Sequence, residues 1–295
     1  FNGEDFDLSG KVLHFRGVDR KTTISSTTFT KPAFKNVGAG SSFWRIVFSR
    51  HEQSSGTSGT LITNGTNEHL SIRECTFVNC RSIIESVGSS TSSLPTVLDR
   101  VIVTGSKSTA IEVQTNGYAE ITNCEFQVDS SFAGTVLNLG SGLSSGSRIH
   151  VHHTSVVTGA AGSIGIKGSA TVTNSVVDVS SSAGAGSLGI QAASVNGSFA
   201  SSNFTTPIDS TSGRGNSTTS TIGFSNRGDT PLTLSATSPA VDSTTSPRFK
   251  SSGTEVPGAN RCHFDLTGNK RERFRRVSGG ASETTSGGGG FFFSP

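Results

Sequence analysis

The sequence has no methionine, one tryptophan and one tyrosine, and charged residues fill only 15% of its 295 positions. It also has no run of 18 apolar residues, so we expect no membrane span. Good helix formers are sparse, which argues against a helical bundle. The formal net charge of +3 is too small to indicate nucleic-acid binding. No C-x-x-C pair occurs, so a zinc or redox motif has little support.

Small residues are abundant where methionine, tryptophan, tyrosine and charged residues are scarce. The chain has 51 Ser, 36 Thr and 36 Gly, and apolar residues make up 32% of it. Because Ile, Val, Leu and Phe recur regularly, disorder of the whole chain is excluded. This composition indicates an all-β protein with small, polar turns.

A degenerate six-residue frame recurs along the chain. Its first and sixth residues are apolar, its third is often Asn, Glu or His, and its fourth is usually small. The frame is clearest at 72–77 and 121–126, returns at 98–103, 151–156 and 172–177, and has a weaker copy at 43–48. Successive copies start 21 to 30 residues apart.

A second series of short apolar runs lies between these copies. Its members are at 61–62, 83–84, 111–113, 136–137, 164–166 and 188–190. Each repeat therefore carries at least two short strands separated by Gly, Ser and Asn turns. This period predicts an all-β, right-handed parallel β-helix of about seven to nine coils, in which equivalent strands pair in parallel.

Two other β architectures are weaker alternatives. A β-sandwich has strands every 8–12 residues, and a propeller needs longer blades with a blade signature. The aligned frame favours the solenoid. We place the β-helix at 1–237, with 1–30 as its N-terminal coil or cap. Strand patterning fades at 238–295, which we interpret as a less regular C-terminal tail.

Three segments resemble known β-helix families. Residues 7–17, followed by Thr-Thr-Ile-Ser at 22–25, resemble the first coil of pectin-lyase-like right-handed β-helices. Ser-Pro-Ala-Val-Asp at 238–242, with 265–271, resembles the close of many secreted β-helix proteins. The Gly and Phe run at 287–293 resembles a repeat of polymorphic outer-membrane proteins, although their F-x-x-N repeat is not matched. The resemblance implies a right-handed β-helix.

The same resemblance raises the question of catalysis, because this fold includes pectate lyases and polygalacturonases. The N-T-D, D-D, G-H-G and R-I-K segments of the hydrolases are absent. Glu74 and Asp99 lie on adjacent coils, and inverting hydrolysis needs two carboxyl groups about 6.5–9.5 Å apart. Strand alternation predicts that they face opposite ways. We therefore assign no catalytic residue and no cofactor.

Sequons and cysteines point to the exterior of a cell. Sequons begin at Asn64, Asn196, Asn203 and Asn216, which favours a secreted or cell-surface glycoprotein. Unmodified Asn in turns is the alternative. An even number of cysteines fits disulfides without fixing their pairing, and the candidates are Cys75, Cys80, Cys124 and Cys262.

Three further polar features have structural and functional interpretations. His150 and His152 lie two apart on one strand and are weak candidates for a metal, without an evident third ligand. Asn123 and Asn174 share the third position of the frame, which predicts a stacked amide ladder. The basic run at 270–276 is either a solvated arm or a contact for anionic polysaccharide or phosphate.

The C-terminal tail suggests self-association. Phe291, Phe292 and Phe293 suit a strand added to a solenoid edge, after a Gly-rich hinge. Capping of the same subunit is the alternative. The sequence thus predicts a non-catalytic extracellular structural or adhesive protein, glycosylated and assembling into a homo-oligomer or filament. A carbohydrate-active enzyme or a carbohydrate-binding β-helix is the second hypothesis.

Overall fold

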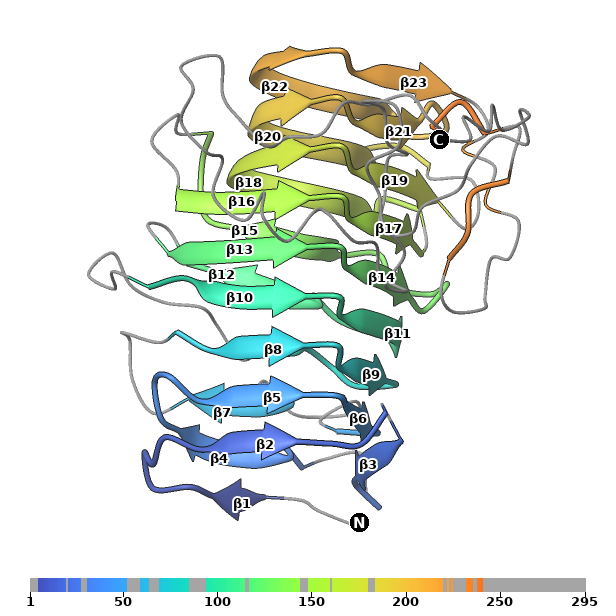
Figure 1. Cartoon of the computed structure of the whole chain (residues 1–295). Helices are drawn as coiled ribbons and strands as arrows, with labels where there is room; N and C mark the ends of the chain where they lie inside the picture. Colours follow the sequence, from blue (N-terminus) through green and yellow to red (C-terminus); the bar gives the residue numbers. More distant parts are fainter. Residues whose placement is uncertain are drawn as a thin grey trace, which may run out of the picture.

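The chain forms a parallel β-helix with three strand-bearing faces (Figure 1). The computed structural model describes residues 5–240 except 20, 28–30, 52–58, 64–68, 85–93, 115–116, 144–147, 160, 180–183, 220–221, 223, 225–231 and 236–237. None of the described residues forms a helix that could cross a membrane. The expected seven to nine coils are confirmed, because the third face has nine strands.

The strands of each face follow one another up the solenoid. The first face has β1 (Phe6–Asp7), β4 (Phe34–Val37), β7 (Leu61–Thr63), β12 (Ile111–Val113), β15 (Thr135–Leu139) and the first halves of β18 (Ile164–Thr173), β20 (Leu188–Asn196) and β22 (Thr206–Arg214). The second face has β2 (His14–Arg16), β5 (Ser42–Trp44), β8 (Ser71–Arg73), β10 (Thr96–Asp99), β13 (Tyr118–Thr122), β16 (Arg148–His152) and the second halves of β18, β20 and β22.

The third face is the most regular. It has β3 (Thr22–Ser25), β6 (Ile46–Ser49), β9 (Thr76–Val78), β11 (Ile102–Ser106), β14 (Glu125–Val128), β17 (Ser155–Thr158), β19 (Val176–Val179), β21 (Phe199–Ser201) and β23 (Ser217–Thr219). In Figure 1 the second-face strands run rightwards in front while the chain climbs, so the coils are right-handed, as crossovers between parallel strands almost always are.

The core is a set of stacked columns that narrows along the axis. On the second face the inward column begins with Phe15 and Phe43 and ends with Val195 and Gly213. The equivalent third-face column begins with Ile24, Phe48 and Phe77 and ends with Ala200 and Thr218. The aromatic rings of the first coils contact one another, with Phe48 and Phe77 stacked 4.9 Å apart. Apolar burial is therefore concentrated at the N-terminal end.

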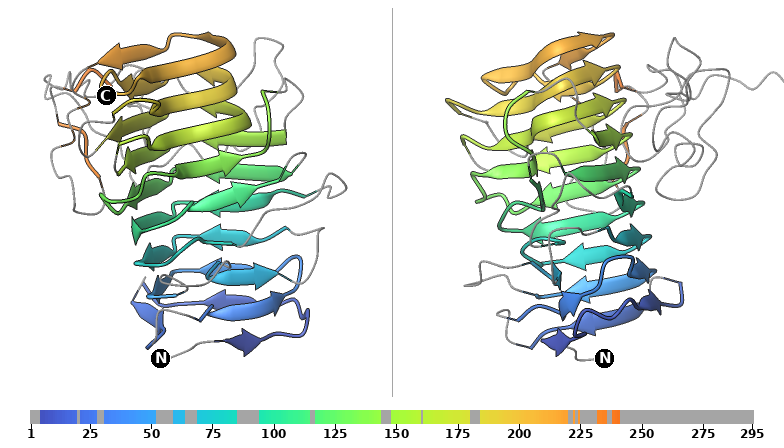
Figure 2. Two further views of the ribbon diagram at one scale, coloured as in Figure 1. Left: turned by 180° about the vertical axis from the view of Figure 1, so that it is seen from behind. Right: turned by 90° about the vertical axis from the view of Figure 1, so that its left-hand side faces the viewer.

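A short segment after the last strand covers part of the third face. We call its described residues the third-face strap: Ile222, Phe224, 232–235 and 238–240. Ile222, Leu234 and Ala240 pack against Val176 and Phe199, which point outward from β19 and β21. Figure 2 shows the orange part of this segment beside the third-face strands. Residues 241–295, including most of the predicted tail, lie outside the described residues.

Candidate functional site

The third position of the frame is a left-handed turn in every coil that the structure describes from the second onward. Its φ is 58° at Arg45, 52° at Glu74, 56° at Arg100, 54° at Asn123, 46° at His153 and 52° at Asn174, and glycines 197 and 215 continue the series. Each turn donates its N–H to the next coil, as Glu74 does to the Asp99 carbonyl at 2.9 Å. The turns therefore place a column of polar side chains along one edge of the solenoid, between the second and third faces.

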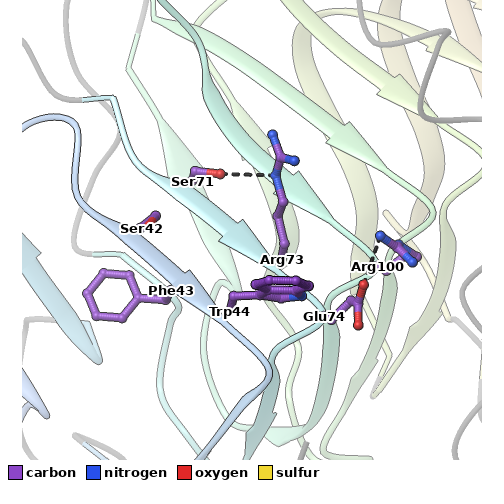
Figure 3. Close-up of a pocket in the computed structure, with 7 residues that line it drawn as sticks. All are labelled: Ser42, Phe43, Trp44, Ser71, Arg73, Glu74 and Arg100. Carbon is purple, nitrogen blue, oxygen red and sulfur yellow. Dashed lines mark hydrogen bonds and ion pairs between the residues drawn. The ribbon is translucent and has the colours of Figure 1, made fainter. Parts of the chain in front are cut away.

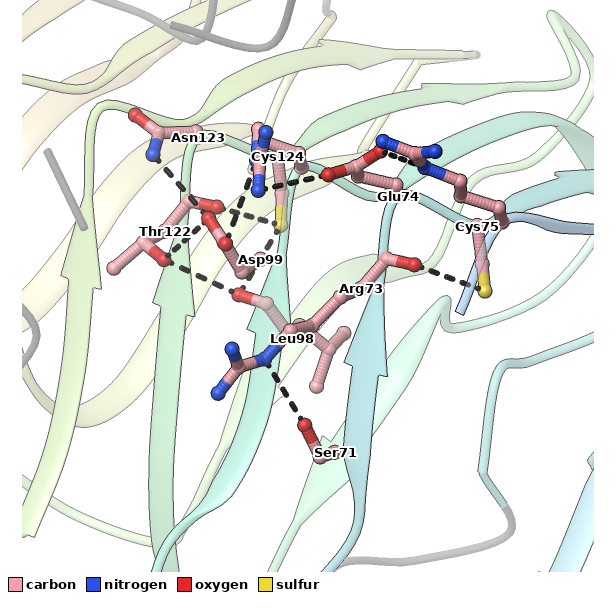
Figure 4. Close-up of polar contacts among 11 residues, drawn as sticks. Ser71, Arg73, Glu74, Cys75, Leu98, Asp99, Thr122, Asn123 and Cys124 are labelled. Atoms are coloured by element: carbon pink, nitrogen blue, oxygen red, sulfur yellow. Dashed lines mark hydrogen bonds and ion pairs between the residues drawn. The ribbon is translucent and has the colours of Figure 1, made fainter. Parts of the chain in front are cut away.

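Charged residues of this column form an ion-pair network (Figure 4). Glu74 lies between two arginines: its Oε2 is 2.8 Å from Arg45 Nε and its Oε1 is 2.9 Å from Arg100 Nη2. Arg100 Nε also lies 3.5 Å from Asp99 Oδ2. The other oxygen of Asp99 accepts hydrogen bonds from the Thr122 hydroxyl and the Asn123 amide. Both carboxylates thus have charged or polar partners at each oxygen.

These contacts correct the expected orientation of the two carboxylates. Glu74 and Asp99 converge on Arg100 instead of facing opposite ways. The reason is that Glu74 occupies a left-handed turn, where strand alternation no longer applies. Burial alone raises the pKa of the Glu74 carboxyl, but the hydrogen bond from Arg45 and the charges of Arg100 and Arg45 outweigh it and lower the pKa. A carboxylate held ionised in this way is a poor general acid.

The amide ladder is more mixed than its sequence pattern predicts. His153 lies between Asn123 and Asn174 in the column, so the two amides do not stack on each other. Asn174 instead contacts its neighbour, with Nδ2 3.3 Å from His153 Nε2. The shared property of the third position is its left-handed backbone, which Asn adopts more readily than most residues.

The fourth position is buried from the second coil to the eighth, and it holds thiols and hydroxyls as well as Ile46 and Val101. Cys75, Cys124 and Ser175 each donate to the carbonyl two residues back. Towards the C-terminal end the side-chain oxygens also accept from the coil before: Thr154 N–H donates to Ser175 Oγ and Ser198 N–H to Asn216 Oδ1. This column explains why the fourth residue of the frame is small.

Three of the four disulfide candidates lie among the described residues, and no disulfide joins them to one another there. Cys75, Cys80 and Cys124 are all buried. Cys75 and Cys124 lie two coils apart, about 10 Å at the spacing of β-strands, which is too far for a disulfide. Burial raises the pKa of Cys124 and raises that of Cys80 to about 11. Cys262 lies outside the described residues.

The two histidines proposed for a metal lie side by side on β16. The rings of His150 and His152 are stacked, with centroids 6.1 Å apart. The described part of the chain brings together no group of three His, Cys, Asp or Glu side chains that suits a metal ion. The pair alone does not make a metal centre.

The sequons differ in their surroundings. Asn203 is exposed in the turn after β21. Asn196 donates to Ser194 Oγ at 3.1 Å, and Asn216 donates to the Val195 carbonyl at 2.7 Å, so the nitrogen that a glycan would modify is already bonded. Asn64, the basic run at 270–276 and Phe291, Phe292 and Phe293 lie outside the described residues.

A polar groove follows the first face over coils five to eight. Two adjoining hollows of about 400 Å³ each share Asn138, Gly140 and Ser141. Glu112, Asn138, Lys167 and Gln191 stand at equivalent positions of β12, β15, β18 and β20 and point into it. Such a row of amides and charges can hydrogen-bond a polyhydroxyl ligand. No sequence motif marks this groove, because its residues align only once the coils are stacked.

A smaller hollow of about 270 Å³ opens on the second face (Figure 3). It is lined by Ser42, Phe43, Trp44, Ser71, Arg73, Glu74 and Arg100. Figure 3 shows Phe43 directed away from the other labelled side chains, in keeping with its burial in the core. Arg73 donates from Nε to Ser71 Oγ at 3.1 Å. Sequence patterning did not single out this site, since the chain's single tryptophan does not recur from one repeat to the next.

Comparison with known proteins gives no further guide: no family model, curated protein or solved structure matches the chain. The parallel β-helix therefore rests on the strand pairing itself.

Proposed function

We propose that the chain is a non-catalytic, extracellular structural or adhesive β-helix of the pectin-lyase-like type. The observation that carries this proposal is the ion-pair network at Glu74. The carboxylates best placed for acid–base chemistry are held by Arg45, Arg100 and neighbouring amides, and they stabilise the stack. Their arrangement favours a rigid scaffold over a hydrolytic centre.

A surface location and glycosylation belong to the same proposal. The four sequons and the scarcity of charge suit a secreted or cell-surface glycoprotein. We expect glycan at exposed Asn203 and little at Asn196 or Asn216, whose amide nitrogens are bonded. Peptide mass spectrometry of protein purified from its native source, with and without enzymatic glycan release, tests the sites. Labelling of intact cells with an impermeant reagent tests the location.

Self-association through Phe291, Phe292 and Phe293 is the second part of the proposal. The last described coil has Gly213 and Thr218 at the core positions of its second and third faces, so these two faces offer little apolar surface for end-to-end stacking. Assembly through the tail is therefore favoured over stacking of solenoid ends. Sedimentation of the full chain and of a variant ending at Ser286 tests it, and unchanged assembly of the shorter chain argues against it.

The first-face groove favours a second function, binding of carbohydrate. Its stacked row of Glu112, Asn138, Lys167 and Gln191 is the feature that supports it. Incubation with a panel of neutral and acidic polysaccharides, followed by measurement of bound polysaccharide and of new chain ends, tests binding and cleavage separately. We expect no cleavage. Release of oligosaccharides, abolished by Glu112→Gln, would instead establish an enzyme.

A further inference from the structure

Arg16, Trp44 and Arg73 occupy consecutive positions of one outward column on the second face. Arg16 pairs with Trp44, and Trp44 with Arg73, in the registers of β2, β5 and β8. Adjacent strands lie about 4.8 Å apart, so the two arginine backbones are about 10 Å apart with the indole between them. Arg16 and Arg73 are exposed and Trp44 is half-buried.

The indole orders the guanidinium groups around it. The guanidinium carbon of Arg16 lies 4.2 Å from the centroid of the Trp44 ring, and that of Arg45 lies 4.7 Å from it. Stacking on an aromatic face reduces the freedom of an arginine side chain while leaving its N–H edge able to bind an anion.

The two outer arginines keep their charge uncompensated within the described part of the chain. Arg45 and Arg100 share Glu74, and each also approaches a second carboxylate, Asp19 for Arg45 and Asp99 for Arg100. No ion pair joins Arg16 or Arg73 to a described carboxylate, and Arg73 turns towards Ser71. The nearest carboxylate in the same column, Asp99, gives its oxygens to Arg100, Thr122 and Asn123.

The adjacent outward column supplies neutral hydrogen-bonding groups. It contains His14, Ser42 and Ser71 in the same three coils. His14 Nδ1 and Ser42 Oγ lie 2.8 Å apart. The hollow of about 270 Å³ lies beside these groups, so a ligand that spans the two arginines also reaches hydroxyls and the exposed edge of Trp44.

We propose that the column of Arg16, Trp44 and Arg73 binds a sulfated polysaccharide that lies along the solenoid axis, with one sulfate group at each arginine. The guanidinium fork matches a planar pair of sulfate oxygens and, like the sulfate ester, is only weakly hydrated. The indole edge packs against the sugar between the sulfates. This assignment names a ligand class for the proposed adhesive role. It rests on the proposed function in one respect: an extracellular location is what would bring the protein into contact with such a polymer.

Trp44 makes the test direct because it is the only tryptophan in the chain. Its fluorescence is followed while full-length protein is titrated with a size-defined, heparin-derived oligosaccharide. We expect a saturable change that weakens steeply as salt is raised from 0.05 to 0.5 M, a range over which exposed charges are progressively screened. Arg16→Gln and Arg73→Gln should each raise the Kd about fivefold, and the double variant more, as lost charge-assisted hydrogen bonds do.

Arg148→Gln is the matched control, since Arg148 stacks on Tyr118 at 4.3 Å elsewhere on the second face. It should leave the Kd unchanged. Thermal melts check that each variant is folded, which the exposure of both arginines favours. A variant with Lys270, Arg275 and Arg276 changed to Gln tests the basic run, and it should retain the fluorescence change.

Three results would overturn the site. Trp44 fluorescence could stay constant at saturating oligosaccharide, the arginine variants could bind like the parent chain, or binding could depend on the basic run alone. Equal affinity for polygalacturonate, a carboxylated polymer, would overturn the assignment to sulfate. An intracellular location or polysaccharide cleavage would refute the proposed function and leave this binding measurement intact, so the two failures are distinguishable.

Discussion

The carboxylate of Glu125 accepts a hydrogen bond of 2.6 Å from the backbone N–H of Leu232, 107 residues further along the chain. Gln127 donates to the other oxygen at 2.8 Å. Glu125 lies on β14 and is fully buried. The contact fixes the third-face strap to the outer surface of the solenoid.

This contact predicts that attachment of the strap depends on pH. Burial raises the pKa of Glu125 from 4.5 to about 7, against the hydrogen bonds from Leu232 and Gln127. The attached state therefore binds a proton more tightly than a detached state with an ordinary carboxyl. The stabilisation of the attached state by this proton is complete below pH 4.5 and is lost as the pH rises through 7. The free energy of attachment changes by up to about 3 kcal/mol over this range.

Hydrogen exchange of the strap, compared with that of Glu125→Gln at each pH, measures this effect. The amide keeps an acceptor for Leu232 and does not titrate, so the variant should protect the strap better than the parent at pH 8 and similarly at pH 4. Asp178, the other carboxylate on this outer surface, accepts from Val179, and Asp178→Asn serves as the control. Equal protection of parent and Glu125→Gln at pH 8 would contradict the prediction.

Removal of Glu74 should destabilise the N-terminal half of the solenoid. Glu74→Ala leaves Arg45 and Arg100 with only their longer contacts to Asp19 and Asp99. We expect a loss of about 1–3 kcal/mol in the free energy of unfolding, since the arginines are partly exposed. Because the pKa of Glu74 is lowered, its contribution is present above the ordinary Glu range and is lost as the pH falls through the lowered value. Denaturant unfolding at pH 7 and pH 3 measures both. Glu112→Ala, which removes an exposed carboxylate, should change little.

The left-handed turn at Asn174 predicts that glycine is tolerated there better than a larger, branched residue. Its φ is 52°, so Asn174→Gly should cost little, whereas Asn174→Val should cost about 2 kcal/mol or more because a branched side chain clashes there. Melting temperatures of the two variants give the comparison. A less stable glycine variant would show that the contact with His153 matters more than the turn.

The buried thiols predict slow chemical modification. Cys75, Cys80 and Cys124 should resist a thiol reagent in the folded protein and react in denaturant, because burial raises the pKa of Cys80 and Cys124 and excludes the reagent. Counting labelled thiols by mass spectrometry tests this. Labelling of Cys124 at a rate unaffected by denaturant would refute it. Cys75→Ser should fold, since Ser175 and Ser198 fill the same column.

The six-residue frame made the solenoid predictable because each copy of it corresponds to the same sharp turn between the second and third faces. The left-handed third residue and the buried fourth residue recur from the second coil to the eighth, so Glu74-Cys75 and Asn123-Cys124 align despite different chemistry. The chemistry of those positions was less predictable. An even cysteine count suggested disulfides, yet stacking two coils apart separates Cys75 from Cys124.

Contacts between distant segments left no local signal. Leu232 reaches Glu125 through a backbone amide, which any residue other than proline supplies. The frame aligns Trp44 with Arg73, but it has no copy at β2, so Arg16 joins the column only through the register between β2 and β5. Approximate repeats thus predict the architecture, whereas sites that need side chains from several coils require the register.

The narrowing of the core from Phe43 and Phe48 to Val195 and Ala200 has a mechanical consequence. In a solenoid each coil contacts mainly its neighbours, so coils with larger buried side chains resist separation more strongly. Under tension applied at the C-terminal end, we expect the coils to peel off one after another, each requiring more force than the last, until the aromatic coils at the N-terminal end hold as an anchor.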